Sequence, residues 1–376
     1  MADATTTAHV HDVVVVGAGA AGVGAAITLR HAGIEDLLVV DRNGVGASFA
    51  SWPEETRFIT PSFPTNSIGM LDLNSVAIGT SPAFTLSAEH PTGAQYAQYL
   101  QRVATFFEVP VRHGDDVLDV VATDDGFHLV LADGSIRAKH VVWAAGEFQY
   151  PTLNGAPGFE HCRHTATVER YDDLDGDDFI IIGGYESGID AAYHLALRNK
   201  RVRLFDRGCP WQSTSSDPSV ALSIYSVERM RDPRFIQQVD AHPNTHIAAV
   251  RREDDTYVVN SIDGERFETT TQPLFAGGFE GSHRIVADLF EKREDGFPLL
   301  SEDDESTTTP GLFLCGPAVR HGKQSFCFIY KYRQRFAVVA KAIATSLGLP
   351  ATELEHYRMW GMYLDDLSCC GQECAC

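Results

Sequence analysis

The sequence predicts an α/β fold made of two similar strand–turn–helix–strand units, one inserted into the other, followed by a cysteine-rich C-terminal tail. Three observations support this prediction. A glycine-rich turn follows a β-branched run near the N-terminus, a similar turn recurs at Gly183, and four cysteines fall within the last eight residues. Because β-branched runs of this kind are typical of buried parallel strands, each turn is expected to join a strand to a helix.

Length and composition limit the class of protein. The chain has 376 residues, of which 44% are hydrophobic and 22% charged, so it can bury a sizeable core in more than one domain. This composition excludes a disordered chain, a fibrous repeat and a disulfide miniprotein. No apolar run reaches the roughly 18 residues of a membrane helix, and the polar start lacks the features of a secretory signal. We therefore expect a cytoplasmic protein with no membrane insertion.

The charge argues against two classes of partner. Thirty Lys and Arg residues face 51 Asp and Glu residues, which gives a net charge of −21. Nucleic acid binding needs a basic surface against the phosphates, and docking on anionic lipid needs one too. We expect neither partner.

The first unit carries a dinucleotide fingerprint in its required context. It reads as a strand in Asp12–Val16, the turn Gly17-x-Gly19-x-x-Gly22, a helix over Val23–His31 and a strand over Leu37–Val40 that ends at Asp41. In this motif Gly17 permits the tight turn, Gly19 lets the backbone approach a pyrophosphate, and Gly22 lets the helix pack on the strand. The helix N-terminus would face the phosphates, and Asp41 stands where a carboxylate binds ribose hydroxyls.

The second unit repeats this pattern with one change. A strand over Phe179–Ile182 leads into Gly183-Gly184-Tyr185-Glu186-Ser187-Gly188, then a helix through Arg198 and a strand over Val202–Phe205, closed by Asp206-Arg207. Tyr185 replaces the second fingerprint glycine, and its side chain would crowd a pyrophosphate. The unit therefore binds a nicotinamide nucleotide or is a Rossmann domain that has lost its ligand. Asp206 favours NADH because a carboxylate repels a 2′-phosphate, whereas Arg207 would accommodate one.

Two short segments and a helix complete the predicted architecture. Residues 141–146 and 273–278 each form a strand that runs into small residues, as in hinges between two domains. A strand and a sharp turn over 311–317 precede one long helix, expected at about 325–347. The predicted domains are residues 1–150 plus 272–347, an inserted domain at 151–271, and a tail at 348–376.

These motifs resemble a known group of flavoproteins. The double Rossmann layout and Gly146-Glu-Phe-Gln-Tyr-Pro151 look like flavin-containing monooxygenases and thioredoxin-reductase-like proteins. Thr80-Ser-Pro-Ala-Phe-Thr85, the segment 184–193, the segment 330–338 and the cysteine-rich ending resemble more closely the CzcO-type group, predicted accessories of the CzcD cation-efflux protein. The resemblance covers essentially the whole chain. It implies an FAD-binding domain with a nicotinamide-binding domain inserted into it, bound FAD, and use of NAD(P)H.

The resemblance and the fingerprints together name the expected contacts. For FAD these are Gly17, Gly19, Gly22, Asp41, Arg42, Trp52, Ala145, Gly146, Gly316 and Gln324. For NAD(P)H they are Gly183, Gly184, Ser187, Gly188, Asp206 and Arg207. Trp52 is interpreted equally well as a core aromatic or as a ring beside the flavin.

Two usual disulfides of related reductases are missing from the sequence. Residues 42–52 contain no cysteine, so the Cys-x4-Cys pair of glutathione-reductase-type enzymes is absent. No Cys-x-x-Cys, as in thioredoxin reductases, occurs in 151–271, and Gly316-Pro317 replaces the usual Gly-Asp. No built-in disulfide is therefore expected to face the flavin at either usual place.

The tail cysteines are the remaining candidates for chemistry. Cys369, Cys370, Cys374 and Cys376 are predicted to carry electrons or to bind a soft metal ion, because thiolates suit both tasks. A dispensable tail is the plain alternative. Three functions stay open: a reductase that passes electrons from NAD(P)H through FAD to a small-molecule or protein thiol or disulfide, or to a thiophilic metal; a flavin-dependent monooxygenase; and a non-catalytic metal-binding accessory. A homodimer is also possible.

Overall fold

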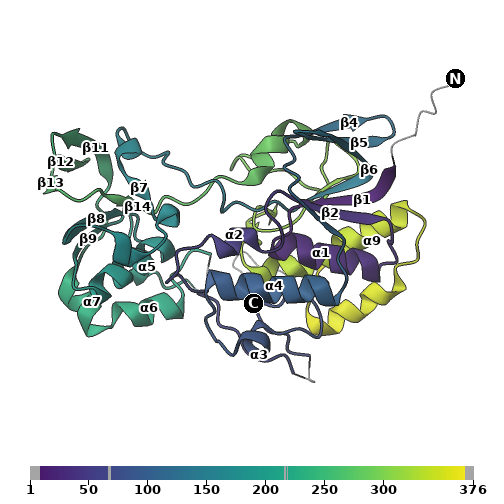
Figure 1. Ribbon diagram of the computed structural model, residues 1–376, viewed down its shortest axis with the longest axis horizontal. Coiled ribbons are helices and arrows are strands. Elements are labelled where there is room, and N and C mark those ends of the chain that lie inside the picture. Colours follow the sequence, from purple (N-terminus) through teal and green to yellow (C-terminus); the bar gives the residue numbers. More distant parts are fainter. Residues whose placement is uncertain (1–8, 67–68, 216, 218, 369–376) are drawn as a thin grey trace.

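Two β-sheets form two units that lie side by side in the computed structural model, which describes residues 9–66, 69–215, 217 and 219–368 (Figure 1). The sheet of the first unit has the order β3-β2-β1-β6-β5-β4, with β15 beside β6. Its strands are β1 (Val10–Val16), β2 (Leu37–Asp41), β3 (Val111–His113), β4 (Asp119–Thr123), β5 (Gly126–Leu131), β6 (Gly134–Trp143) and β15 (Leu312–Leu314).

Parallel pairing places β1 at the centre of the first sheet. Val14 lies opposite Leu38 on β2 and Val141 on β6, and Val14 and Val141 are fully buried. The helices α1 (Ala20–His31), α4 (Gly93–Phe106) and α9 (Phe336–Ser346) pack on one face of the sheet (Figure 1). Two short helices, α2 (Ala47–Ala50) and α3 (Pro82–Leu86), lie in the loops that follow β2.

The first helix begins earlier than the sequence indicates. It starts at Ala20, three residues before the expected Val23, because Gly19 is its N-cap in an extended conformation. Gly22 therefore lies inside the first turn of α1 and faces the loop that leads into it.

The second unit has a five-stranded sheet of the order β10-β9-β8-β14-β7. Its strands are β7 (Arg163–His164), β8 (Asp178–Ile182), β9 (Arg201–Phe205), β10 (Val239–His242) and β14 (Leu274–Phe275). The helices α5 (Glu186–Leu197), α6 (Ile224–Met230) and α7 (Pro233–Gln238) lie together beneath it in Figure 1. A separate antiparallel sheet contains β11 (Ile247–Glu253), β12 (Thr256–Ser261) and β13 (Arg266–Thr269). All strands of the first sheet lie within residues 1–150 and 272–347, whereas the second sheet also includes β14, which lies just beyond the predicted end of the inserted domain at residue 271.

The chain passes between the units through two adjacent segments. Pro151 forms an antiparallel bridge with Phe279, and the amide of Glu280 donates to the carbonyl oxygen of Tyr150 at 2.8 Å. The amide of Ser282 donates to the carbonyl oxygen of Gly146 at 2.9 Å. The stretches that follow the two expected hinges, residues 146–151 and 279–282, therefore lie side by side and are hydrogen-bonded to each other.

The prediction of one long helix over 325–347 is wrong. Residues 324–325 pair with 320–321 as the short strands β17 (Gln324–Ser325) and β16 (Arg320–His321), and the helix is divided into α8 (Ile329–Tyr332), a 3-10 turn at Arg333–Arg335 and α9. The turn holds two buried guanidinium groups. Arg333 donates to the carbonyl oxygen of Ser75 at 2.8 Å, and Arg335 forms a buried ion pair with Asp304. These basic residues are thus anchors in the core.

Much of the predicted tail packs on the first unit. The 3-10 segment Thr352–Trp360 follows α9, and Leu354 and Met362 are fully buried in the core of the first unit. The amide of Leu364 donates to the carbonyl oxygen of Gln334 at 3.0 Å, and Arg335 donates to the carbonyl oxygen of Leu364. The chain is therefore part of the fold as far as Leu364. The tail cysteines 369, 370, 374 and 376 lie outside the described residues.

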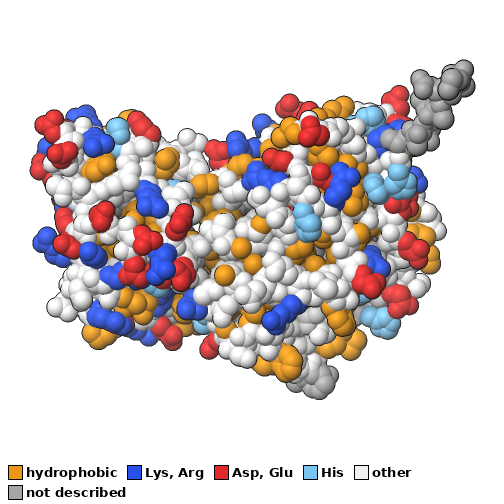
Figure 2. All heavy atoms as spheres, in the orientation of Figure 1, with side chains coloured by type: hydrophobic (Ala, Val, Ile, Leu, Met, Phe, Trp, Pro, Cys, Tyr) orange, Lys and Arg blue, Asp and Glu red, His pale blue; other side chains and the backbone are white. Residues whose placement is uncertain are grey.

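Charged side chains of both signs are interspersed over the second unit on the face drawn in Figure 2, so the excess negative charge does not gather in one patch of that face. Within the described part of the chain, none of the helices combines the length and the hydropathy that crossing a membrane requires.

Candidate functional site

A cavity of about 490 Å³ lies where the two units meet. Residues at the carboxyl ends of β1, β2 and β6 line it, together with the first turn of α5 and the segment around α8. Seven predicted FAD contacts and one predicted NAD(P)H contact are in its wall: Gly17, Gly19, Asp41, Arg42, Trp52, Ala145, Gly146 and Ser187. The carboxyl end of a parallel sheet is where α/β folds bind ligands.

The turn after β1 has no room for side chains at two positions. Gly17 has a φ of +104°, and a Cβ there would lie 2.6 Å from the carbonyl oxygen of Ala144. A Cβ at Gly22 would lie 1.8 Å from the carbonyl oxygen of Gly17. The close approach of β1, β6 and α1 therefore depends on these two glycines.

Gly19 has a different environment. It is the N-cap of α1 with a φ of −80°, and a Cβ there would meet no protein atom within 4 Å. The first amide groups of a helix lack partners within the helix and carry partial positive charge. The structure thus has open space at an anion-binding helix end, which fits a pyrophosphate.

Hydrogen bonds hold the carboxylate of Asp41 at the edge of the same cavity. Its Oδ2 accepts from the amide of Ala18 at 2.8 Å, and its Oδ1 accepts from the amides of Asn43 and Gly44 at 2.8 and 2.7 Å. The side chain is thereby fixed beside the turn, where it can accept hydrogen bonds from ribose hydroxyls.

Trp52 is a core aromatic that also lines the cavity, and a place beside the flavin stays a prediction for it. Its ring stacks on Phe58 with centroids 5.0 Å apart and packs against the core, and it also lines the cavity. Gly316, with a φ of +109°, lies behind the wall near Ala21, and its neighbour Pro317 lines the cavity. Gln324 is on the short strand β17 and is not among the residues of the wall.

Glu147 is a cavity residue that sequence reasoning missed. It follows Gly146 directly and lines the wall. Burial raises the pKa of its carboxyl, and the nearby Arg320 guanidinium offsets only part of that shift. A carboxyl with a raised pKa inside a cavity is a candidate proton donor. Only its place in the string 146–151 offered a signal.

The turn of the second unit reproduces the geometry of the first. Gly183 has a φ of +102°, and a Cβ there would lie 2.6 Å from the carbonyl oxygen of Ala276. A Cβ at Gly188 would lie 1.8 Å from the carbonyl oxygen of Gly183. The Oδ2 atom of Asp206 accepts a hydrogen bond from the amide of Gly184 at 2.7 Å. In the first unit, Oδ2 of Asp41 accepts from the amide of Ala18 in the same way.

The surroundings of this second turn differ from those of the first, because Tyr185 replaces the second fingerprint glycine. Tyr185 is the N-cap of α5, and its hydroxyl donates to the carbonyl oxygen of Ala221 at 2.9 Å. Its ring packs against the core of the second unit, and Trp211 lies beside Gly184. The tyrosine ring is therefore turned toward the loop that contains Ala221. Arg207 is exposed and follows Asp206 directly.

The first residues of α5 belong to the main cavity. Glu186, Ser187 and Asp190 line it with the residues of the first turn. The Glu186 carboxylate accepts hydrogen bonds from the amide of Ser223 and the hydroxyl of Ser226, both at 2.5 Å. Burial raises the pKa of Glu186, although these hydrogen bonds lower it in part.

One described cysteine lies in the cavity wall. This residue is Cys327, whose Sγ lies 3.1 Å from the Ser219 hydroxyl. Burial raises the pKa of Cys162 to about 12 and raises the pKa values of Cys209 and Cys315. Because the thiolate is the reactive form, these three are poor nucleophiles.

Comparison with known proteins identifies the family. The family model described as pyridine nucleotide-disulphide oxidoreductase matches residues 14–316. The chain belongs to this family. It is a flavoprotein oxidoreductase that uses FAD and NAD(P)H, as the two dinucleotide-type turns predicted.

Individual relatives are distant. The chain is 22% identical to bacilliredoxin reductase Bdr of Bacillus subtilis over 88% of this chain and 97% of Bdr. It is 26% identical to a CzcO-like oxidoreductase of Geobacillus kaustophilus over 50% of this chain and 52% of that protein, so this likeness spans about half of each chain. The structure of a flavin-containing monooxygenase from Stenotrophomonas maltophilia matches in fold, with a TM-score of 0.68 at 16% identity, over 89% of this chain and 98% of that one.

The cavity fits FAD as the fold family implies. The family's FAD supplies two-electron redox chemistry when bound. Around it, the amides at the start of α1 would hold the pyrophosphate, Asp41 would hold the ribose, and Trp52 and Gly146 would flank the ring system. Glu147 would hold a proton inside the cavity, while the apolar wall excludes water.

Proposed function

We propose that this protein reduces a disulfide acceptor with electrons from NAD(P)H. The observation that supports this most is that one cavity joins the turn for FAD, the first residues of α5 and the thiol of Cys327. The relative from Bacillus subtilis is named for reduction of bacilliredoxin, and it aligns over nearly its full length. Overall, NAD(P)H and a proton would convert the disulfide to two thiols.

Cys327 is proposed as the thiol on the flavin side of the reaction. Its thiolate would attack the acceptor disulfide, form a mixed disulfide and release one thiol. Two electrons from NAD(P)H, passed through the flavin, would then break the mixed disulfide and restore Cys327 with release of the second thiol. The acceptor is a small-molecule disulfide, a protein disulfide, or one formed by Cys369, Cys370, Cys374 and Cys376 of the tail.

The contacts of the two cofactors are part of this proposal. For FAD we propose Gly17, Gly19, Gly22, Asp41, Arg42, Trp52, Ala145, Gly146 and Gly316, and for the nicotinamide nucleotide Gly183, Gly184, Ser187, Gly188, Asp206 and Arg207. The fixed carboxylate of Asp206 supports NADH over NADPH. Gln324, on its short hairpin, has no support from the cavity wall. The CzcO-type assignment, a soft-metal acceptor and a homodimer stay predictions.

A monooxygenase is the second candidate. Cys327 is the only thiol in the described cavity wall, so no ready-made dithiol faces the flavin there. A cavity lined by aromatic and apolar residues also suits a flavin that reacts with oxygen and an oxidisable substrate. The fold match to a monooxygenase agrees with this candidate but does not favour it over a reductase.

One experiment tests both candidates. The purified flavoprotein is titrated anaerobically with NADH and with NADPH, and the reduced protein is then mixed with a low-molecular-weight disulfide or with oxygen. We expect NADH to reduce the flavin at least as fast as NADPH, and the disulfide to reoxidise it while two thiols appear per flavin. Rapid reoxidation by oxygen alone, with no thiol formed from the disulfide, would contradict the reductase and support the monooxygenase.

A further inference from the structure

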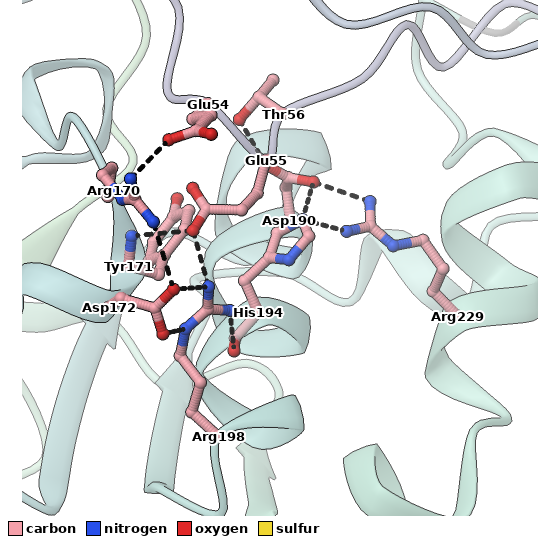
Figure 3. A network of polar contacts seen from close by, with 10 residues as sticks. All are labelled: Glu54, Glu55, Thr56, Arg170, Tyr171, Asp172, Asp190, His194, Arg198 and Arg229. Carbon is pink, nitrogen blue, oxygen red and sulfur yellow. Dashed lines mark hydrogen bonds and ion pairs between the residues drawn. The ribbon is translucent and has the colours of Figure 1, made fainter. Parts of the chain in front are cut away.

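Polar contacts connect the two units beside the cavity (Figure 3). The segment 53–57 of the first unit follows Trp52 and approaches α5 and the 170–172 turn of the second unit. The hydroxyl of Thr56 donates to Oδ2 of Asp190 at 2.7 Å. Arg198 donates to Oε1 of Glu55 at 2.6 Å, and the amide of Tyr171 donates to the same oxygen at 3.1 Å.

These contacts are shielded from solvent. The side chains of Glu55 and Arg198 are 17% and 20% exposed, and those of Asp190 and Arg229 are 11% and 8% exposed. Charge pairs at exposed positions contribute little, whereas partly buried pairs resist screening by salt. A third pair, Glu54 with Arg170 at 3.2 Å, is exposed and is expected to contribute less.

The second unit holds its own side of these contacts rigidly. Arg229 donates to Oδ1 of Asp190 at 2.7 Å, and its guanidinium lies 4.2 Å from the ring centroid of Tyr193. Arg198 forms two hydrogen bonds with Asp172, at 2.6 and 2.9 Å. The groups that meet Glu55 and Thr56 therefore also have partners within the second unit.

The Thr56–Asp190 contact acts near the end of α5 that opens into the cavity, whereas Arg198, the partner of Glu55, is the C-cap at the other end of the helix. Glu186 and Asp190 are four residues apart, so they lie on the same face of the helix, and both line the cavity. Lys331 of α8 also forms an ion pair with Asp217 of the second unit at 3.0 Å. The second unit is thus held to the first by contacts with α8 as well as with the segment 53–57.

We propose that the Thr56–Asp190 and Glu55–Arg198 contacts position the nucleotide-binding helix α5 for electron transfer from NAD(P)H to the flavin. Thr56, Glu55, Asp190 and Arg198 are positioning residues, since they act through the placement of α5. This inference rests on the proposed use of both cofactors in one cavity. Transfer between two bound groups depends steeply on their separation, and a misplacement of about 1 Å costs roughly 100-fold in rate.

Thr56→Val and Glu55→Gln test this proposal, because each keeps the size of the side chain: the first removes the hydroxyl that donates to Asp190, and the second removes the negative charge that pairs with Arg198. We expect each variant to lower the limiting rate of anaerobic flavin reduction by NADH about 10-fold, within the range that small misplacements produce. Flavin content and the apparent affinity for NADH should stay within about twofold, since neither residue is among the proposed nucleotide contacts. Thr56→Ser keeps the hydroxyl and should restore the rate.

Hydrogen–deuterium exchange supplies a readout that does not depend on turnover. Amides of residues 54–57 and of the start of α5 should exchange faster in Thr56→Val and Glu55→Gln than in the wild-type protein. Glu253→Gln is the matched control, because it breaks an exposed pair with Arg266 inside the second unit. It should change neither the reduction rate nor the exchange at residues 54–57.

The outcomes separate this inference from the proposed function. If NADH reduces the wild-type flavin and the variants match it in limiting rate, the positioning role is overturned while the proposed function stands. Faster reduction in the variants would overturn it as well. If neither NADH nor NADPH reduces the wild-type flavin, the proposed function fails and the positioning role fails with it.

Discussion

The sulfur of Cys327 lies 3.1 Å from the hydroxyl oxygen of Ser219, so a thiol of the first unit meets a hydroxyl of the second at the wall of the flavin cavity. Ser219 also accepts a hydrogen bond from the buried ammonium group of Lys331 at 2.9 Å. With its oxygen engaged by a cation, the Ser219 hydroxyl can donate its own hydrogen bond to the sulfur.

Cys327→Ser should separate flavin reduction from disulfide reduction. We expect normal flavin content and normal reduction by NADH, but disulfide turnover at least about 100-fold slower, because a serine hydroxyl does not exchange with disulfides at neutral pH. The measurement is thiol release under NADH, followed in parallel with anaerobic flavin bleaching. Cys209→Ser is the control, since Cys209 is outside the cavity wall. Unchanged turnover in Cys327→Ser would remove Cys327 from the mechanism.

Gly19→Val should give a folded protein without flavin. The backbone of Gly19 has a φ of −80°, and a Cβ there meets no protein atom within 4 Å, so the fold accepts a side chain. The same side chain would occupy the space expected for the pyrophosphate, weakening FAD binding by roughly 100-fold, or about 2.7 kcal/mol. Flavin absorbance after incubation with FAD and a thermal melt measure the two effects. A variant that retains stoichiometric FAD would refute the assignment of this turn.

A truncation can separate the tail cysteines from the part of the tail that packs on the first unit. Removal of every residue after Leu367 deletes all four tail cysteines and leaves the buried residues Leu354, Met362 and Tyr363 in place. We expect an unchanged flavin spectrum and unchanged reduction by NADH, with loss of the ability to reduce the acceptor or to retain a soft metal. Full acceptor reduction by the truncated protein would show that the tail is not required.

A longer truncation serves as the structural control. Ending the chain at Pro350 removes Leu354, Tyr357 and Met362 from the core of the first unit. Loss of one large buried side chain costs about 2–5 kcal/mol, so this variant should unfold or aggregate. The contrast between the two truncations distinguishes a chemical role of the tail end from a structural role of the segment before it.

The free energy of unfolding should fall at acid pH, in part because of Asp190. Burial alone would raise its pKa, but the bonds with His194, Arg229 and Thr56 outweigh burial and lower the pKa to about 2 from 3.8. Because the folded-state pKa is depressed, its contribution is present above pH 3.8 and is lost as the pH falls toward 2. Asp190→Asn should therefore cost about 2 kcal/mol at pH 7.

Denaturant unfolding of the wild type and Asp190→Asn between pH 7 and pH 3 measures this dependence. The difference in free energy of unfolding should shrink toward the acid end of the range, because the unfolded chain, in which the carboxyl has the ordinary pKa of 3.8, binds a proton before the folded protein does. A constant difference across the range would show that the packing of the side chain matters and its charge does not.

Local patterns carried most of the fold prediction. The strands β1, β2, β8 and β9 lie within one or two residues of their expected bounds, because β-branched runs next to glycine turns leave few alternatives. The small-residue positions at Gly17 and Gly183 were also predictable. At each position a Cβ would collide with a backbone carbonyl oxygen of the segment that follows a neighbouring strand. The need for glycine therefore shows in a single residue of the sequence.

The sequence by itself predicted the two dinucleotide-type units and their order along the chain, since each depends on short motifs that act locally. FAD and NAD(P)H together were implied by the resemblance to flavoproteins, and the family shows their use. Only the tertiary structure decided which residues share the cavity. Glu147, Asp190 and Cys327 come from distant parts of the chain, and no local pattern places their side chains in one cavity. Burial alone gives Glu147 its raised pKa. Likewise, Arg333 and Arg335 of the 3-10 turn bind Ser75 and Asp304. These partners lie far away in the sequence, so no local helix pattern predicts the turn.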